Sequence, residues 1–385
     1  MLESSNIEIS KSALGNNIKF IRSIIDMRVK ISSVVKGNAY GHGIEIFVPL
    51  AEGEGINHFS VFSADEAARV REVCSDSTDI MIMGNIDNED LSWAIENNIE
   101  FFVFENSRLE AAIKAAKKLK KKAKIHIEVE TGMNRTGYEI KELRKAIELM
   151  KNSSDYISLE GLCTHYAGAE SIANYVRIQK QYKNFIRLKN ALLKQKLKPK
   201  RCHTACSAAT IAYPKTQMDM VRIGILQYGY WPSRETHIHY FNRYRVEKNG
   251  VDPLKRIITW RSKVMNTKTV KTGEFVGYGT TYLAQFDMKI ATVPVGYGHG
   301  FGRSLSNVGR VLLNGHRVGV VGMVNMNLMI IDITGLKVKK GDEVILIGEQ
   351  GDVEISVASF SELSDQVNYE TLTRLPLNIP RKIVD

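Results

Sequence analysis

The feature that most constrains the fold is a regular alternation of short β-rich runs and helix-length segments through roughly the first 225 residues. Each run is rich in branched or aromatic residues and is followed by enough chain to form a helix. The eight predicted strands are Ile31–Lys36, His58–Phe62, Ile80–Met83, Glu100–Phe104, Ile125–Glu130, Ser158–Thr164, Arg201–Thr204 and Met218–Arg222. Strands alternating with helices predict a parallel sheet, and eight such units predict a (β/α)8 barrel of the TIM type.

After about residue 255 the pattern changes to short strands with frequent glycine, which predicts a mainly β second domain built as a small barrel or sandwich. Its expected strands are Lys289–Val295, Gly309–Leu313, Val318–Val321, Met329–Ile333 and Glu343–Ile347. We therefore predict an α/β protein with a barrel over residues 11–250 and a β-rich domain over residues 251–385. The alternating residues 1–10 are expected to join the second domain, whereas residues 228–256 look aromatic, basic and irregular.

The most informative short stretch is VVKGNAYGHG, which spans residues 34–43 and places Lys36 after an apolar run and directly before a glycine-punctuated loop. A lysine in this position is partly desolvated, which lowers its pKa and makes its amine a nucleophile able to form a Schiff base. The aldehyde most often captured in this way is pyridoxal 5′-phosphate (PLP), whose ring acts as an electron sink. Tyr40, four residues on, could place its hydroxyl against a phosphate held by the same loop.

Further candidate residues follow from the barrel architecture, because functional side chains lie at the C-terminal ends of barrel strands. The polar residues at or just past such ends are Lys36, Arg135, His165, Ser207 and Arg222. A guanidinium suits carboxylate and phenolic oxygens, and a hydroxyl at the start of a helix suits phosphate. The architecture and the candidate chemistry therefore point to the same end of the barrel.

These motifs resemble those of the alanine racemase family over residues from about 7 to 381, with only residues 228–256 unmatched. The resemblance implies that PLP is bound to Lys36 and that Arg135 contacts both the phenolic oxygen and the substrate carboxylate. It also implies that His165 stacks over the pyridine ring. The remaining cofactor-binding residues that it implies are Tyr40, His203, Ser207, Arg222, Gly224, Ile225 and Tyr369.

Arg222 is the residue that the resemblance pairs with the pyridine nitrogen, with His203 contacting the guanidinium in turn. A guanidinium cannot give up its proton, so the pyridine nitrogen stays unprotonated. A full carbanion on the cofactor is then less favoured, which suppresses transamination and suits a racemase.

The second domain carries Tyr278 between two glycines, and the family motif makes this tyrosine the second base. The resemblance implies a homodimer with shared active sites, in which Tyr278 of the partner subunit and Lys36 act on opposite faces of the substrate. The implied reaction is interconversion of L-alanine and D-alanine, the latter a component of peptidoglycan. The substrate-binding residues that the resemblance implies are Arg135, Met326 and Asn327.

The chain departs from the family pattern in three places, one of which is Cys206, which stands directly before Ser207 where the family usually has asparagine. Glu128 stands where many members carry a carbamylated lysine that orients the equivalent of Arg135, so Glu128 is expected to hold that arginine. Met323, Asn325 and Asn327 stand where the family usually has arginine, a small residue or cysteine, and aspartate. Removal of charge beside the substrate side chain leaves open a racemase for serine, lysine or ornithine, or one with a broad range.

Two more distant alternatives are a fold-related PLP decarboxylase and a non-catalytic PLP-binding protein. The phosphate motifs expected of the decarboxylases are missing. A single-barrel carrier protein would need neither a second domain nor Tyr278.

The net charge of +11 raises the question of nucleic acid, since much of it lies in Lys114–Lys124 and Lys194–Arg201. No aromatic interleaving accompanies either run, so both are interpreted as solvated helix faces and no nucleic-acid partner is expected. There is no signal-peptide pattern and no apolar stretch long enough to span a membrane, which favours a cytoplasmic enzyme without a membrane partner. The four cysteines have neither disulfide nor metal-site spacing, and no metal is expected.

Overall fold

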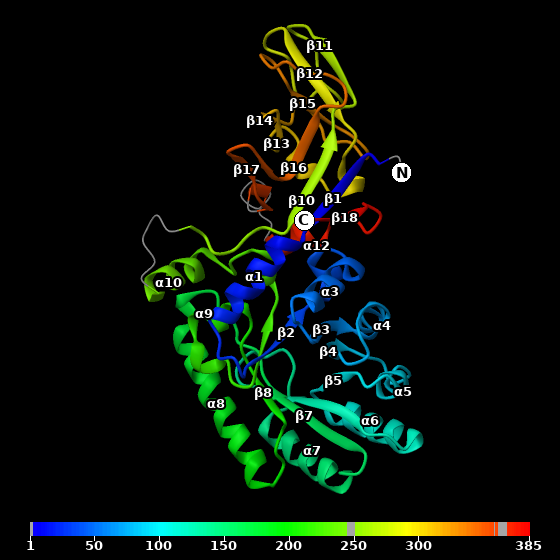
Figure 1. Ribbon diagram of the computed structural model, residues 1–385, viewed down its shortest axis with the longest axis vertical. Coiled ribbons are helices and arrows are strands. Elements are labelled where there is room, and N and C mark those ends of the chain that lie inside the picture. The colour runs from blue at the N-terminus through cyan, green and yellow to red at the C-terminus, as the bar shows by residue number, and fades with distance from the viewer. Residues whose placement is uncertain (1–2, 245–250, 358, 361–367) are drawn as a thin grey trace. The chain divides into compact units, whose positions relative to one another are not determined.

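The computed structural model describes residues 3–244, 251–357, 359–360 and 368–385 (Figure 1). The chain forms two compact units. The barrel unit comprises Ala13–Ala39 and Phe47–Lys255, and the β unit comprises Met1–Ser12, Tyr40–Ile46 and Arg256–Asp385. The predicted division at residue 250 stays a proposal.

The barrel unit contains an eight-stranded parallel sheet in the order β8-β7-β6-β5-β4-β3-β2-β9. Its strands are β2 (Lys30–Val34), β3 (His58–Ser63), β4 (Asp79–Asn85), β5 (Glu100–Val103), β6 (Ala123–Glu128), β7 (Ile157–Cys163), β8 (Arg201–His203) and β9 (Met220–Ile223). Two backbone hydrogen bonds link the ends of β8 and β9, one from Asp219 N, just before β9, to Cys202 O at 3.1 Å, and one from Arg222 N to Ala205 O, just after β8, at 2.9 Å. The sheet therefore closes on itself, and the predicted (β/α)8 barrel is confirmed.

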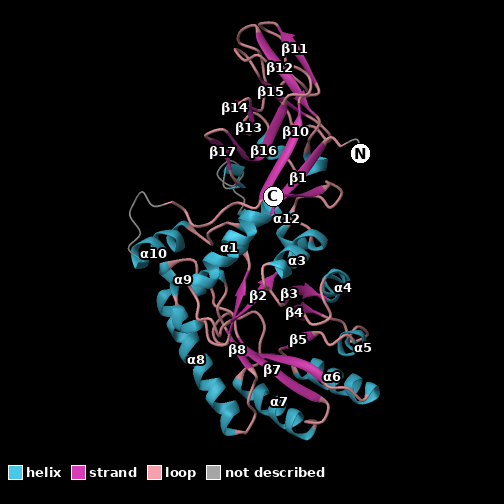
Figure 2. Ribbon diagram, in the orientation of Figure 1, coloured by secondary structure: helices cyan, strands magenta, loops and turns pink. Residues whose placement is uncertain are grey.

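Helices lie on the outside of these strands (Figures 1 and 2). They are α1 (Lys11–Ser23), α3 (Ile44–Gly53), α4 (Ala64–Val73), α5 (Leu91–Glu96), α6 (Asn106–Leu119), α7 (Ile140–Asn152), α8 (Tyr175–Lys194) and α9 (Ser207–Ala212). In α6 the apolar stripe of Leu109, Ala112, Ile113 and Ala116 is buried, whereas Lys117 and Lys118 lie in its last turn. The lysine run is thus the polar face of an amphipathic helix, as the sequence predicts.

The β unit contains a seven-stranded sheet in the order β14-β13-β16-β10-β1-β18, with β17 paired to β16, and a three-stranded sheet in the order β11-β12-β15. Its elements are β1 (Ser5–Ser10), β10 (Ile258–Lys263), β11 (Asn266–Val270), β12 (Met288–Val293), β13 (Arg310–Leu313), β14 (His316–Gly319), β15 (Met329–Asp332), β16 (Glu343–Gln350), β17 (Val353–Ile355), α12 (Asn368–Thr373) and β18 (Arg381–Val384). β1 pairs antiparallel with β10 and parallel with β18, as expected for an N-terminal strand that joins this sheet.

The expectation that residues 228–256 are irregular is wrong, because α10 (Arg234–Tyr244) lies within them. The helix is stabilised by aromatic contacts instead of a strong apolar stripe. The ring of Tyr240 lies 5.3 Å from that of Trp231 and 5.2 Å from that of Phe20, and His237 lies 4.6 Å from Phe241. These packing partners include a residue on α1, far away in sequence.

Among the described residues, none of the helices combines the length and the apolar character needed to cross a membrane. All four cysteines are free thiols.

Candidate active site

Lys36 opens a left-handed turn and does not end a strand. The strand β2 ends at Val34, and α2 (Lys36–Tyr40) has positive φ angles of 61°, 55° and 53° at Gly37, Asn38 and Ala39. This corrects the predicted strand Ile31–Lys36. Left-handed conformation is costly outside glycine and asparagine, so the turn needs outside support.

Glu66, a buried residue of α4, gives that support. Its carboxylate accepts hydrogen bonds from the backbone N–H groups of Gly37 at 2.6 Å and Asn38 at 3.3 Å, and from Phe62 N at 2.9 Å. Arg69, also on α4, donates to the side-chain oxygen of Asn38 at 2.6 Å. Side chains on one helix therefore hold the turn that presents Lys36.

Desolvation by the surrounding protein lowers the pKa of Lys36, and the positive charge of Arg135 lowers it further. Lys36 is nevertheless exposed to solvent in the single chain, so its desolvation is partial, as the sequence predicts. A lowered pKa increases the fraction of neutral, nucleophilic amine.

Arg135 lies on a loop whose two ends are joined by a β-bridge between Val129 and Tyr138. The bridge consists of hydrogen bonds from Tyr138 N to Glu128 O at 2.9 Å and from Glu130 N to Tyr138 O at 3.1 Å. The carboxylate of Glu130 folds back over this loop and accepts from the backbone N–H groups of Met133 at 2.7 Å and Asn134 at 2.8 Å. The loop is thus shaped by an acidic side chain that does not face the arginine it carries.

Glu128 is buried, and this burial raises its pKa, while a hydrogen bond from Thr136 and the charges of Arg222 and Arg135 act in the opposite direction. Within the described part of the chain, Glu128 forms no ion pair with Arg135. The expected direct contact between Glu128 and Arg135 is therefore not present in this structure. The carboxylate attracts Arg135 through space and bonds to the neighbouring threonine.

His165 follows β7 and lies among basic groups. Desolvation lowers its pKa to about 3, and the charges of Arg222, Arg135 and Lys36 contribute to the shift. The imidazole is therefore neutral at physiological pH. This electrostatic coupling shows that the barrel brings together four of the predicted residues, since His165 is affected by each of the other three.

Arg222 is buried and held on two sides. Its Nη1 atom donates to His203 Nδ1 at 2.5 Å and to His203 O at 2.9 Å, and its Nη2 atom donates to Thr164 O at 2.8 Å. The predicted contact between Arg222 and His203 is present. The guanidinium is thus fixed in orientation at the C-terminal end of β9.

Ser207, the first residue of α9, is buried and accepts a hydrogen bond from Gly224 N at 3.0 Å. Ile225, the next residue, is also buried. The loop after β9 therefore meets the start of α9, which brings together three predicted cofactor-binding residues. Cys206 precedes this helix in extended conformation, so the change from asparagine leaves the backbone of the loop regular.

In the β unit, the two tyrosines predicted to contact phosphate lie next to each other. The ring centroids of Tyr40 and Tyr369 are 5.8 Å apart, at an interplanar angle of 50°. Of the motif around Tyr369, Val367 lies outside the described residues.

Tyr278 lies at the tip of a turn in the β unit, between Gly277 and Gly279, whose φ angles are 73° and 74°. Its side chain is 74% exposed, and Met326 is 57% exposed. A Cβ atom on Gly279 would lie 3.9 Å from Met323 Cγ, so the turn passes beside the loop that carries Met326 and the exposed Asn327. The predicted second base and the predicted substrate-binding residues of this unit are therefore neighbours.

Sequence reasoning missed the residues that support this site from behind, namely Glu66, Glu130, His126 and Glu100. The signal for His126 was available, because it lies two residues before Glu128 on a barrel strand and so faces the same side. Glu66 and Glu130 bond to backbone groups that only the folded structure brings into reach.

Comparison with known proteins gives matches over nearly the whole chain. Two family models match, described as alanine racemase, N-terminal domain, over residues 9–232, and alanine racemase, C-terminal domain, over residues 257–383. The chain is 32% identical to the alanine racemase of Leptospira interrogans over 391 residues, which covers 99% of this chain and 96% of that protein.

Solved structures give the same result. The structure is similar to that of the alanine racemase of Bacillus anthracis with bound L-Ala-P, with a TM-score of 0.90, 32% identity and coverage of 100% of this chain and 96% of that one. It is also similar to the alanine racemase of Bartonella henselae with covalently bound pyridoxal phosphate, with a TM-score of 0.85, 26% identity and full coverage of both chains.

Proposed function

Because this chain belongs to the alanine racemase family, we propose that it interconverts L-alanine and D-alanine with PLP as its cofactor and Lys36 as the residue that binds it. The observation that carries the proposal is the buried pair of Arg222 and His203 at the same strand ends as Lys36. A guanidinium oriented by three acceptor atoms of two residues is suited to face a ring nitrogen without protonating it.

The residues present fit PLP. Lys36 has the lowered pKa that a Schiff-base lysine needs, and Ser207 and Gly224 join two loops that offer a hydroxyl and backbone N–H groups to a phosphate. We assign Tyr40 and Tyr369 to the same phosphate. Once the substrate amine has taken the place of Lys36 on the aldehyde carbon, PLP would supply an electron sink that acidifies the Cα proton of the amino acid.

The side chains of the chain divide the remaining work. Arg135 binds the substrate carboxylate through paired N–H groups. Lys36, neutral more often than an ordinary lysine, accepts or returns the Cα proton at Nζ on one face of the substrate. His165 stays neutral and adds no charge beside the proton-transfer groups.

The opposite face needs a second base, and we assign this role to Tyr278 of the partner subunit in a homodimer. The high exposure of Tyr278 in a single chain supports this assignment, because a catalytic tyrosine functions where water is excluded. In the L-to-D direction the tyrosine takes the proton and Lys36 returns one, and in the D-to-L direction they exchange roles.

A chiral assay of purified protein with PLP and L-alanine, L-serine, L-lysine or L-ornithine tests the reaction and its substrate. We expect D-alanine to form fastest. Borohydride reduction of the holoenzyme should fix the cofactor on the peptide that contains Lys36. The matched control is the peptide containing Lys30, the first residue of β2, the strand that precedes Lys36; Lys30 is ion-paired to Asp79 at 2.6 Å. Label on any lysine other than Lys36, or no racemisation of any amino acid, would overturn the proposal.

A further inference from the structure

Behind Arg222, the interior of the barrel unit holds a group of buried polar side chains that the proposed reaction does not use. His58, His126 and His203 are fully buried, and Glu100 is 1% exposed. They come from β3, β6, β8 and β5, so four strands contribute them to the barrel interior. Barrel interiors are usually filled by branched apolar residues, so this polar layer calls for an explanation.

These side chains form a continuous hydrogen-bonded chain. His203 Nε2 lies 2.8 Å from His126 Nδ1, and His126 Nε2 lies 2.7 Å from Glu100 Oε2. His58 Nε2 lies 3.3 Å from the same carboxylate oxygen. The chain therefore runs from Arg222 through two imidazoles to a buried carboxylate.

The chemistry of the two ends fixes the direction of every bond. Arg222 can only donate, so His203 Nδ1 must accept and the proton of His203 must be on Nε2. His203 then donates to His126 Nδ1, which leaves the proton of His126 on Nε2, facing Glu100. Both imidazoles are neutral, and the whole chain points from a permanent cation toward an anion.

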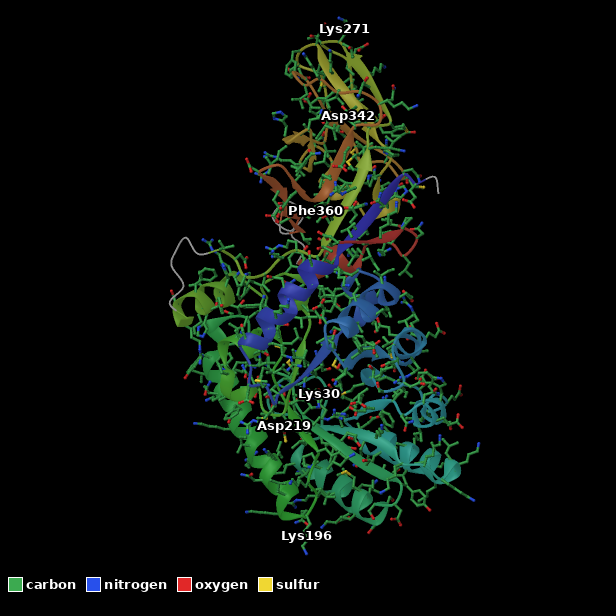
Figure 3. All side chains as sticks on the ribbon, in the orientation of Figure 1. Lys30, Lys196, Asp219, Lys271, Asp342 and Phe360 are labelled. Atoms are coloured by element: carbon green, nitrogen blue, oxygen red, sulfur yellow. The ribbon has the colours of Figure 1, made fainter. Side chains whose placement is uncertain are left out.

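The far end of the chain is anchored at the N-terminal end of the barrel. Arg201 Nη2 donates to Glu100 Oε1, and Arg201 Nη1 lies 3.7 Å from Asp79, which is paired with Lys30. Figure 3 labels Lys30 and Asp219, whose backbones are joined at this end by a hydrogen bond from Lys30 N to Asp219 O of 3.0 Å. Glu100 is therefore held as a carboxylate by donors on both oxygens.

The strands leave room for this chain. A Cβ atom on Gly161 of β7 would lie 2.1 Å from His126 Nδ1, so only glycine admits the ring in its present position. Phe102 flanks the two imidazoles, with its ring centroid 6.0 Å from that of His126 and 5.9 Å from that of His203. Water is excluded from the bonds between them.

We infer that Glu100 and His126 are positioning residues, which hold His203 as the Nε2–H tautomer and strengthen its hydrogen bond to Arg222. The effect of Glu100 and His126 on catalysis rests on the proposed function, because the proposed function places Arg222 against the cofactor ring. A chain of hydrogen bonds that ends on an anion polarises each member, so His203 Nδ1 becomes a better acceptor than an isolated imidazole. The guanidinium is then held more firmly and is a weaker donor toward the ring nitrogen.

The protonation states agree with this geometry. Burial and the nearby charge of Arg222 keep the pKa of His203 well below its usual value. Burial opposes ionisation of Glu100, but the hydrogen bonds from His126 and His58 keep its pKa well below the usual range.

The first test uses the apoprotein and needs no activity. With histidine labelled by ¹⁵N, NMR distinguishes Nδ1–H from Nε2–H, and the nine histidines of the chain make assignment by single variants practical. We expect His203, His126 and His58 as neutral Nε2–H tautomers, with imidazole protons that exchange slowly. An Nδ1–H tautomer at His203 or His126, or titration of His203 between pH 5 and 8, would overturn the inference.

The second test removes the charge at the end of the chain. Glutamine at position 100 has one acceptor oxygen where the carboxylate has two, so Glu100→Gln leaves His126, His58 or Arg201 facing an N–H group. We expect the Nε2–H signal of His203 to move upfield. In the holoenzyme kcat should fall about 10- to 100-fold, by analogy with the outer partners of metal-bound histidines. KM for alanine should stay within about twofold, because the substrate contacts are untouched.

Glu160→Gln is the matched control. Glu160 is also buried and lies 3.5 Å from Arg201, but its other partners are Lys200 and Ser158, and none is a histidine. This variant should leave the His203 signal and kcat as in the wild type. His126→Gln should retain more activity than His126→Leu, because glutamine can accept from His203 and donate to Glu100.

The outcomes separate this inference from the proposed function. The positioning role alone would be refuted if the wild type racemises alanine and the Glu100→Gln variant has the same His203 signal and the same kcat as the wild type. A wild type without racemase activity, but with the tautomers and the signal shift described, would refute the reaction and leave the hydrogen-bonded chain established.

Discussion

At the scale of single residues, the barrel end is defined by basic groups held close together. Desolvation and the charges of Arg135 and Arg222 lower the pKa of both Lys36 and His165. Glu128 is a buried acid beside them, and its pKa is raised by that burial. The protonation of Lys36, His165 and Glu128 therefore depends on burial and on the charges of their neighbours.

His165 gives a direct measure of this environment in the apoprotein. Its pKa is about 3 in the folded state, so below the unfolded value of about 6.5 the unfolded chain binds a proton that the folded chain does not. The free energy of unfolding should therefore fall as pH drops from about 6.5 toward 3. Between pH 7 and pH 5, the free energy of unfolding of the wild type should fall by at most roughly 2 kcal/mol more than that of His165→Gln. Urea unfolding at several pH values measures this, and parallel curves for the two proteins would contradict it.

Glu128→Gln tests whether a fixed carboxylate replaces a carbamylated lysine. Glutamine can still accept the hydrogen bond from Thr136, so the change removes charge with little loss of structure. We expect KM for L-alanine to rise about threefold to tenfold, since Arg135 loses a nearby anion worth on the order of 1 kcal/mol. The melting temperature should change little. Bicarbonate should leave the wild-type rate unaffected, and a rate that depends on bicarbonate would count against the idea.

At the scale of elements, the loop after Lys36 makes a close approach to α12 within the β unit. A Cβ atom on Gly41, whose φ is +79°, would lie 1.9 Å from Leu372 O. Arg381 on β18 also donates to Gly41 O, at 2.8 Å from Nη2. This approach places Tyr40 beside Tyr369, which lies on α12.

Gly41→Ala should therefore destabilise the protein and weaken PLP binding. Gly273→Ala is the matched control, since Gly273 is in the same unit with a φ of +85° and has nothing within 4 Å of its Cβ position. Gly273→Ala should lower the free energy of unfolding by about 1–2 kcal/mol, because alanine is strained in the left-handed backbone conformation. Gly41→Ala should cost at least about 2 kcal/mol more, because backbone atoms must move. Equal losses in urea unfolding and equal PLP affinities for the two variants would argue against the close approach.

Elements whose signal is local were predictable from the sequence, and those that depend on distant partners were not. The eight barrel strands were found because each is a short apolar run between helical segments. β11 was not, since Asn266–Thr269 are exposed and its structure comes from pairing with β12. β10 was missed although Ile258, Trp260 and Ser262 alternate as buried residues. Strand-end residues such as Arg222 were found from position and chemistry, whereas Glu100 looks like an ordinary surface acid until the barrel closes around it.

At the scale of the whole molecule, the proposed reaction needs two chains. Lys36 belongs to the barrel unit, while Tyr278 lies on an exposed turn of the β unit. In the homodimer that we propose, each site takes Lys36 from one protomer and its tyrosine from the other. Loss of either residue should then inactivate a homodimer completely but a mixed dimer only in part.

Mixing the inactive variants Lys36→Ala and Tyr278→Ala should therefore restore activity. Random exchange of equal amounts makes about half of the dimers mixed, and each mixed dimer has one intact site of two, so activity should approach about a quarter of the wild-type value. The control mixes Lys36→Ala with a chain that carries both substitutions, because no site then contains Lys36 and activity should stay at background. Native mass spectrometry of differently tagged chains verifies the exchange. Mixed dimers without activity would place the Lys36 and Tyr278 of each site on the same chain, whereas an active Tyr278→Ala homodimer would place Tyr278 outside the reaction.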